Sequence, residues 1–212
     1  MHSGFPAFEA LRQVPDSPSR PARLLSHGPC SAGRGRVEQF IKRVYADRYG
    51  AEVSSFAPML VSLADGDRIV AAAGYRAAAH GPLFLERYLG APVETLLPVA
   101  GGARPCRRGI VEVGHLSSDR FGEGLHLVRL LAAELVERRF EWVVSTVTQE
   151  LRKLFMRLEV VPHALGAADS LALGDDGSHW GSYYEHRPMV LAGHLPSAAD
   201  RIARGVRRGS VS

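Results

Sequence analysis

The sequence of 212 residues contains two cysteines, Cys30 and Cys106, and only two lysines among its 26 basic residues. Two cysteines are too few for a disulfide framework or for a zinc cage. Cys106 lies among arginines, which lower a thiol pKa, but no paired base accompanies it, so an incidental loop cysteine is favoured over a reactive thiol. No His-Glu-x-x-His motif and no Cys/His cluster occurs, so no metal site is expected.

Long hydrophobic runs are also lacking. No apolar run reaches the roughly 18 residues that a membrane-spanning helix needs. The N-terminal segment MHSGFPAFEALRQVPDSPSR lacks the basic-then-apolar order of a secretory signal. We therefore expect a cytoplasmic protein without a transmembrane segment. The apolar share of 46% and the charged share of 23% are ordinary for one globular domain.

The positive charge is confined to the two ends of the chain. Residues 1–36 carry a net charge of +3 and residues 201–212 one of +4, which leaves about −3 for residues 37–200 because the whole chain carries +4. A nucleic-acid footprint would be a basic stripe on the folded part. No nucleic-acid partner is therefore expected, and the sequence gives no indication of the oligomeric state.

Composition divides the chain into three parts. Residues 1–35 are rich in Pro, Gly, Ser and Arg and show no lasting period, which predicts a flexible leader. Residues 36–196 carry the regular hydrophobic patterns of a single domain, and residues 197–212 form a basic, flexible tail.

Hydrophobic periodicity predicts a mixed α/β order within that domain. Helices are expected at 37–50, 83–89, 125–139 and 151–158, and strands at 59–63, 69–75, 110–116 and 142–147, with a hairpin turn at 65–67. The strand at 142–147 is almost wholly apolar, which is typical of a central strand. Residues 160–162 read as extended, 164–178 as a loop, and 180–191 as a strand interrupted by Pro188.

The stretch VEVGHLSSDRFGEG, residues 111–124, places two ionisable groups on an apolar strand. In a regular strand Glu112 and His115 point to opposite faces, whereas a β-bulge near Gly114 would bring them together. Burial raises the pKa of a glutamate, and such a carboxylate at a cleft is a candidate general base. The competing interpretations are a Glu112 paired with Arg76 or Arg108, and a structural or surface His115.

The same stretch ends in a glycine-rich turn before the helix at 125–139. Gly122 and Gly124 let backbone N–H groups approach an anion, and the helix N-terminus adds positive potential. Asp119 and Glu123 would repel a phosphate locally, and an ordinary strand-to-helix turn also uses glycines. The turn is neither a Walker loop nor a Gly-x-Gly-x-x-Gly dinucleotide site. No Gly-x-Ser-x-Gly elbow occurs in the chain.

Several long stretches resemble the thermostable haemolysin family in the same order along the chain. They cover about residues 45–195 and read RYGAEVSSFAPML, RAAAHGPLFLERYLGAPVE, RRGIVEVGHLSS, WVVSTVTQELRKLFMRLEV and HWGSYYEHRPMVLAGHL. That family is similar, at a distance, to GNAT N-acyltransferases and acyl-homoserine-lactone synthases. The resemblance implies a single GNAT-like α/β (α+β) domain, whose central mixed, mostly antiparallel sheet is flanked by helices.

The resemblance also implies an acyl thioester as co-substrate, with no tightly bound cofactor. The usual pyrophosphate loop of such folds is Gln/Arg-x-x-Gly-x-Gly/Ala, and the aligned stretch here is Asp119-x-x-Gly122-x-Gly124. Arg120, Gly122 and Gly124 would hold the donor. The acidic first position leaves both CoA and the phosphopantetheine of an acyl carrier protein open as donors, so a carrier protein is a possible partner.

The activity implied by the resemblance is amide formation between the acyl group and the amine of a small substrate, such as an amino acid, in the biosynthesis of a specialised metabolite. Glu112 would be the base, with His115 as second choice, and Tyr184 would protonate the leaving thiolate. The expected amine pocket is formed by Arg76, Glu86, Glu94 and Arg108, and the arginines can pair with a substrate carboxylate. The alternatives are a non-catalytic GNAT-like binding protein and a membrane-active haemolysin-type protein.

Overall fold

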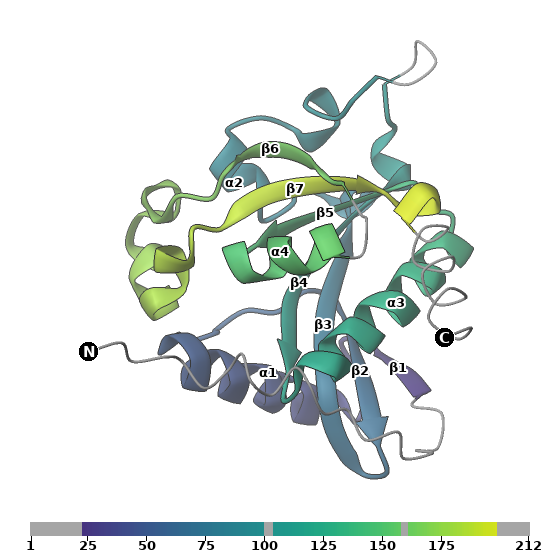
Figure 1. The fold of residues 1–212 in the computed structure, drawn as a ribbon, viewed down its shortest axis with the longest axis vertical. Helices are drawn as coiled ribbons and strands as arrows, with labels where there is room; N and C mark the ends of the chain where they lie inside the picture. Colours follow the sequence, from purple (N-terminus) through teal and green to yellow (C-terminus); the bar gives the residue numbers. More distant parts are fainter. Residues whose placement is uncertain (1–22, 100–103, 158–160, 199–212) are drawn as a thin grey trace.

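A seven-stranded sheet forms the centre of the computed structural model, which describes residues 23–99, 104–157 and 161–198 (Figure 1). Its strand order is β1-β2-β3-β4-β5-β7-β6, and only the β4–β5 pair is parallel. The strands are β1 (Arg23–His27), β2 (Met59–Asp65), β3 (Arg68–Ala77), β4 (Ile110–Ser118), β5 (Trp142–Val147), β6 (His163–Ala167) and β7 (Met189–His194). The expected mixed, mostly antiparallel sheet is confirmed, and β5 lies inside it as predicted.

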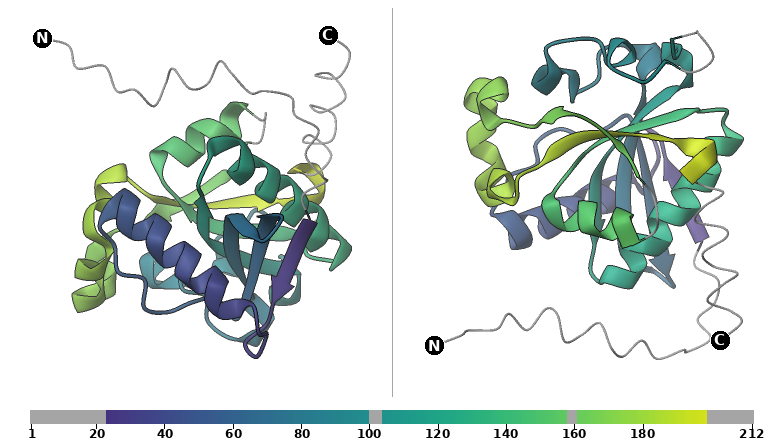
Figure 2. Two further views of the ribbon diagram at one scale, coloured as in Figure 1. Left: turned by 90° about the horizontal axis from the view of Figure 1, so that it is seen from below. Right: turned by 45° about the horizontal axis from the view of Figure 1, so that its top comes forward.

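Helices cover both faces of this sheet (Figure 2). The α-helices are α1 (Arg34–Tyr49), α2 (Glu86–Leu89), α3 (Phe121–Glu137) and α4 (Gln149–Arg157), and a long 3₁₀ segment runs over Ser170–His186. Gly50 ends α1 in the left-handed conformation, as its place in the sequence predicted. The α3 helix starts four residues earlier than the pattern predicted, so Gly122 and Gly124 belong to its first turn.

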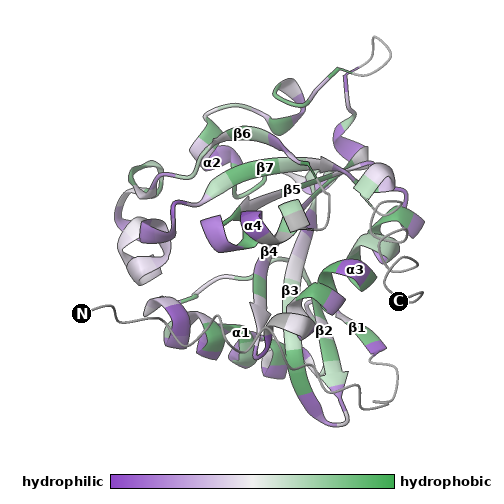
Figure 3. Ribbon diagram, viewed as in Figure 1, coloured by the Kyte–Doolittle hydropathy of each residue, from purple (hydrophilic) through white to green (hydrophobic). Residues whose placement is uncertain are grey.

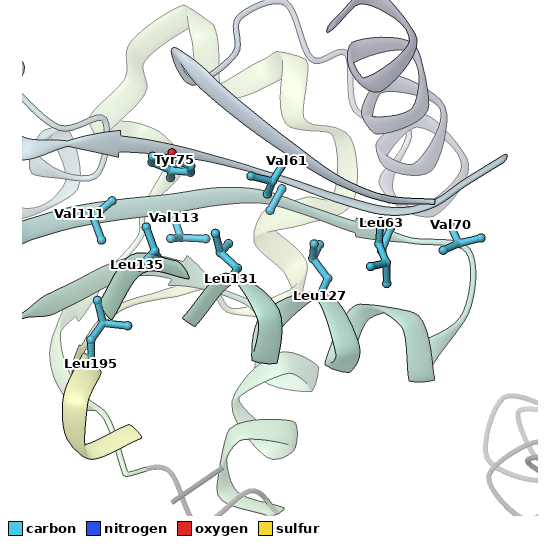
Figure 4. Packing of buried hydrophobic residues seen from close by; sticks show 12 residues of the cluster. Val61, Leu63, Val70, Tyr75, Val111, Val113, Leu127, Leu131, Leu135 and Leu195 are labelled. Carbon is cyan, nitrogen blue, oxygen red and sulfur yellow. The ribbon is translucent and has the colours of Figure 1, made fainter. Parts of the chain in front are cut away.

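The alternation of side chains along β2 and β3 divides the core between the two faces. Leu127, Leu131 and Leu135, one stripe of α3, pack on one face (Figure 4). The strand residues beneath them are Val61, Leu63, Ala71, Ala73, Val111 and Val113. Each leucine is almost fully buried, which makes α3 the main cover of this face.

The opposite face is covered by α1 and by the segment between β3 and β4. Val37, Phe40, Ile41 and Val44 of α1 pack with Leu60 and Ala72, and the bands of alternating hydropathy on α1 are visible in Figure 3. Farther along the sheet, Leu83, Leu85 and Val93 pack on Ile110, Val144 and Val190. The 3₁₀ segment Ser170–His186 closes this side, because Trp180 and Tyr183 pack against Tyr45 of α1.

The parallel strands β4 and β5 separate halfway along their length. Their pairing covers only residues 110–112 of β4 and 142–144 of β5. The Ser145 hydroxyl then donates a hydrogen bond of 2.7 Å to the Val113 carbonyl, at the point where the strands part. Beyond it, β4 stays beside β3 and β5 stays beside β7, so the sheet is split between them (Figure 1).

Three sequence-based expectations were wrong. Residues 23–27 form β1 within the segment 1–35 that was predicted to be a flexible leader, since pairing with β2 orders a short edge strand that has no strong pattern of its own. Residues 163–167 form β6 instead of a loop. Residues 180–186 are helical turns and not a strand, because their aromatic residues, typical of strands, pack here against α1. Residues 1–22, 160 and 199–212 lie outside the described residues.

Within the described ranges, no helix is long and apolar enough to span a bilayer.

Two glycines interrupt the 3₁₀ segment with nearly identical backbone angles. Gly174 has φ 59° and ψ −134°, and Gly181 has φ 51° and ψ −130°. A Cβ at 174 would meet open space, whereas a Cβ at 181 would overlap the Tyr49 carbonyl oxygen at the end of α1. The two positions thus share the backbone strain and differ in the steric contact.

We predict that Gly174→Ala lowers the free energy of unfolding by about 1–3 kcal/mol, the strain of a glycine-only conformation. Gly181→Ala should cost about 1–3 kcal/mol more, because the end of α1 must move. Denaturant unfolding of both variants measures the difference. Equal losses would show that the contact between residue 181 and α1 contributes nothing to stability.

Candidate active site

A β-bulge in β4 shapes the site. Gly74 of β3 pairs with Gly114 and Ala72 pairs with Ser117, so one β3 residue stands opposite both His115 and Leu116. His115 adopts φ 55°, a left-handed conformation that is rare for a non-glycine residue. The bulge turns His115 to the face that carries Glu112, and both side chains line one cavity. The β-bulge near Gly114 that Glu112 and His115 need in order to share a face is therefore present.

Gly74 makes room for the turned imidazole. A Cβ at residue 74 would lie 2.9 Å from the Ala57 Cβ and 3.1 Å from His115 Nδ1. Contacts this close force neighbours to move, so the turned histidine depends on a glycine at residue 74, which lies beside the bulge.

Two cavities meet at the bulge. The first, called here the aromatic cavity, has a volume of about 100 Å³ and is lined by Tyr45, Ser55, Phe56, Ala57, Arg76, Phe84, Tyr88, Glu112, Val113, Gly114, His115, Thr146, Trp180 and Tyr183. The second, called the helix-end cavity, has a volume of about 480 Å³ and extends from the bulge to the first turn of α3 and the start of α4. Gly114, His115 and Thr146 line both, so the two cavities adjoin where β4 and β5 part.

Glu112 is held in the aromatic cavity by backbone donors. Its carboxylate accepts hydrogen bonds from the N–H groups of Phe84, at 2.9 Å, and Leu85, at 3.0 Å. Burial raises the pKa of Glu112, and the two N–H bonds and the nearby Arg76 oppose this rise without cancelling it. Arg76 is the direct neighbour of Glu112 in the β3–β4 ladder and also lines the cavity, whereas Arg108 is exposed.

His115 is a neutral imidazole with one nitrogen free. Its Nε2 lies 3.2 Å from the Ser55 carbonyl, so Nε2 carries the proton and donates it. The pKa of His115 is lowered to about 4, mainly by burial and further by Arg76 and Arg34, while the Ser55 bond opposes the change. Nδ1 is buried and has no hydrogen-bond partner among the described residues. The lone pair of Nδ1 is thus available to accept a hydrogen bond.

Aromatic rings from distant parts of the chain form the rest of the aromatic cavity. Phe84 and Tyr88 come from the segment between β3 and β4, and Trp180 and Tyr183 come from the 3₁₀ segment. Tyr184 does not line the cavity, but its hydroxyl lies 2.8 Å from that of Tyr88, which does. Burial raises the pKa of both tyrosines. The cavity can therefore hold an apolar or aromatic group beside one cation and one carboxylate.

The helix-end cavity contains the strand-to-helix turn. Its walls include Ser117, Ser118, Asp119, Arg120 and Gly124. A Cβ at 124 would come within 2.9 Å of the Ser118 hydroxyl, so this glycine lets the first turn of α3 approach the end of β4. Gly122 faces open space. The N–H groups of residues 121–123 have no intrahelical acceptor, whereas the Gly124 N–H donates to the Arg120 carbonyl at 3.3 Å. The free N–H groups make this end of α3 electropositive.

Asp119 is compensated by two arginines. Its carboxylate forms ion pairs with Arg43, at 3.0 Å, and Arg68, at 2.8 Å. Burial alone would raise the pKa of Asp119, but the hydrogen bonds from Arg68 and Arg43 outweigh it and lower the pKa. The three side chains together carry a net positive charge. The repulsion that Asp119 would exert on a phosphate is thereby offset.

Glu86 and Glu94 do not line the aromatic cavity. Arg107 binds both carboxylates, at 2.7 Å and 2.6 Å, and Glu86 also accepts the N–H groups of Leu83 and Val93. Burial alone would raise the pKa of Glu86, but the bonds from Arg107 and these N–H groups lower it. The cluster fixes the segment that presents Phe84 N–H and Leu85 N–H to Glu112.

Sequence reasoning missed Arg107, Phe84, Tyr88 and Trp180. The only signal for the aromatic residues was their density in LFLERYL and HWGSYY. That density does not specify a shared cavity, because the two segments are about 95 residues apart. Arg107 stands beside Arg108 in RPCRRG, and nothing local distinguishes the half-buried arginine from the exposed one.

The lowered pKa of His115 predicts a specific pH dependence of stability. Between about pH 6.5 and 4 the unfolded chain binds a proton at His115 and the folded chain does not, so stability falls as the pH falls through this window. His115→Asn, which tolerates the left-handed backbone, should weaken this dependence by about 1–2 kcal/mol between pH 7 and pH 5. Between pH 7 and pH 8 the two proteins should respond alike. The same loss of unfolding free energy between pH 7 and pH 5 in the wild type and in the variant would contradict a buried neutral histidine.

Comparison with known proteins gives a family and a fold. The family model described as "Thermostable hemolysin" matches residues 27–199. No curated protein matches the sequence. Among solved structures, the chain is similar to FeeM, an N-acyl amino acid synthase from uncultured soil microbes, with a TM-score of 0.58 and 14% identity over 85% of this chain and 95% of that one.

Two further structures are similar at comparable distance. One is BjaI, a CoA-dependent acyl-homoserine lactone synthase solved with SAM and isopentyl-CoA, with a TM-score of 0.57 and 13% identity over 86% of this chain and 90% of that one. The other is a candidate N-acetyltransferase from Lactobacillus plantarum, with a TM-score of 0.51 and 12% identity over 83% and 99% of the two chains. The chain thus belongs to the thermostable haemolysin family, and its fold is that of the GNAT-like acyltransferases.

Proposed function

We propose that the protein is an N-acyltransferase that joins a thioester-bound acyl group to the amine of a small substrate. The observation that carries the proposal is the convergence at the β4 bulge of a buried carboxylate, a neutral imidazole and a half-buried arginine, next to a larger cavity at a helix N-terminus. The fold, shared with acyl-transferring synthases, supports the same reaction class. The acceptor would bind in the aromatic cavity and the donor in the helix-end cavity.

The donor would be CoA or the phosphopantetheine of an acyl carrier protein. Its phosphate would bind at the first turn of α3, near Arg120, Gly122 and Gly124, because unpaired backbone N–H groups and the helix dipole favour an anion there. The net positive charge of Arg43, Arg68 and Asp119 supports this placement. BjaI, which is similar in fold, was solved with SAM and isopentyl-CoA, and this supports a thioester donor of the CoA type.

The acceptor would be an α-amino acid. Arg76 would bind its carboxylate, and Glu112 and His115 Nδ1 would face its amine. The aromatic rings would surround its side chain. Glu86 and Glu94 would act on this pocket through Arg107 and the backbone of residues 83–93, without touching the acceptor. Arg108 is exposed and receives no role in this proposal.

The reaction forms one C–N bond and breaks one C–S bond. The neutral amine attacks the thioester carbonyl, whose oxygen accepts a hydrogen bond from a backbone N–H of the bulge. Glu112 takes the amine proton, directly or through water, and His115 Nδ1 positions the amine. As the C–S bond breaks, Tyr184 supplies a proton to the thiolate by way of the Tyr88 hydroxyl. The proton taken by Glu112 then returns to Tyr184 through solvent, and the products are an amide and a free thiol.

Removing the base should abolish most of the activity. Glu112→Gln should lower thiol release from acyl-CoA and acyl-pantetheine in the presence of amino acids by about 10²- to 10⁴-fold. Glu137→Gln, the same change at an exposed position on α3, should leave turnover unchanged. A folded Glu112→Gln variant with full turnover would contradict the base role. A wild-type protein that releases no thiol from any donor would contradict the proposed function in favour of a non-catalytic binding protein.

The carboxylate contact can be tested separately with paired acceptors. Arg76→Gln should lower kcat/KM for an amino acid such as phenylalanine by about 10- to 100-fold, since a hydrogen bond to a charged group contributes about 1.5–3 kcal/mol. The same variant should change kcat/KM for phenylethylamine, which lacks the carboxylate, by less than about threefold. Comparing the two acceptors removes any effect of Arg76 on Glu112. Equal losses for both acceptors would show that Arg76 does not bind the carboxylate.

A further inference from the structure

We propose that a third cavity, on the opposite face of the sheet, binds the hydrocarbon chain of the acyl group, and that the preferred donor carries a chain of several methylenes and not acetyl. This inference rests on the proposed function, because it identifies the class of acyl donor. It is carried by an apolar cavity that adjoins both cavities of the site.

The third cavity, called here the apolar cavity, lies between the sheet, α3 and α4 and has a volume of about 100 Å³. Its lining comprises Val113, Leu116, Val128, Leu131, Ala132, Leu135, Val143, Ser145, Val147, Phe155, Pro162, Leu191, Ala192, Gly193, Leu195 and Ala198. Among the described lining residues only Ser145 has a polar side chain, and its hydroxyl already donates to the Val113 carbonyl. The cavity therefore offers no free polar side chain to a polar ligand.

This cavity is partly open to the surface, so its apolar lining stays in contact with water, and covering that lining with an apolar group is favourable. Water gains no hydrogen bonds there, so a cavity of this composition takes apolar ligands instead. A saturated chain satisfies that chemistry, whereas an amino acid or a phosphate does not.

The walls of the apolar cavity are continuous with those of the site. Leu116 and Val128 line both the apolar cavity and the helix-end cavity, and Val113 lines both the apolar and the aromatic cavity. Val113 and Leu116 both belong to β4. They lie beyond the last residue pair between β4 and β5, which is formed by Glu112 and Val144. A thioester carbonyl at the bulge would therefore stand at the gap between the strands, and its chain would extend through the gap toward α3.

Ala132 gives a way to shorten the cavity without altering the site. It is a half-buried residue on α3 that lines the apolar cavity and neither of the other two. Ala133 is the next residue on the same helix and is exposed. Ala132→Leu and Ala133→Leu are thus the same chemical change, directed once into the cavity and once into solvent.

The test measures thiol release with straight-chain acyl thioesters from acetyl to dodecanoyl. For the wild type, kcat/KM should rise about fourfold per methylene until the cavity is full. Ala132→Leu should abolish the gain for the longer chains and leave the shortest chains unchanged, and Ala133→Leu should match the wild type throughout. In parallel, the rise in melting temperature with decanoate, and its absence with acetate, measures binding without catalysis.

The outcomes separate this inference from the proposed function. Turnover that is independent of chain length, or equally affected by the two leucine variants, would overturn the chain-binding role while the acyltransferase stands. Decanoate binding that Ala132→Leu abolishes and Ala133→Leu preserves would support the role of the apolar cavity even if no thioester is turned over. Decanoate binding that is the same in all three proteins would contradict it.

Discussion

The separation of β4 from β5 after three residue pairs is the feature on which the rest of the site depends. A continuous parallel sheet would have filled the space at Gly114, His115 and Thr146 with backbone hydrogen bonds. The separation leaves room for the β-bulge, and the bulge turns His115 to the face that carries Glu112. One irregularity in β4 thus brings a carboxylate and an imidazole into one cavity and opens that cavity toward the first turn of α3.

The carboxylates in and near the site are stabilised by backbone N–H groups and by arginines. Glu112 accepts hydrogen bonds from two N–H groups, and Arg107 fixes the segment that supplies them through its ion pairs with Glu86 and Glu94. Arg107 therefore influences Glu112 without touching it. Asp119 is likewise balanced by Arg43 and Arg68, which come from α1 and β3. The outcome is a site with one carboxylate of raised pKa and a positive helix end. The first can accept a proton and the second favours a phosphate.

The elements with strong periodicity could be predicted from the sequence, and the contacts between distant segments could not. The leucine stripe of α3 and the apolar β5 could be predicted, because burial follows directly from their hydrophobic patterns. The β1 and β6 strands owe their form to pairing partners and carry no pattern that specifies them. Glu112 stood out because a charge on an apolar strand is unusual. Arg107 and Trp180 did not stand out, because folding brings Arg107 to Glu86 and Glu94 and brings Trp180 to Phe84.

We propose that thioester chemistry takes place at the β4 bulge. The most direct test is a crystal structure with a non-hydrolysable thioether analogue of an acyl-CoA and an amino acid. We expect the thioether sulfur beside Gly114 and His115, a phosphate against the first turn of α3, and the amino acid carboxylate on Arg76. An analogue bound elsewhere on the protein, with the gap between β4 and β5 closed to it, would contradict this placement of the reaction.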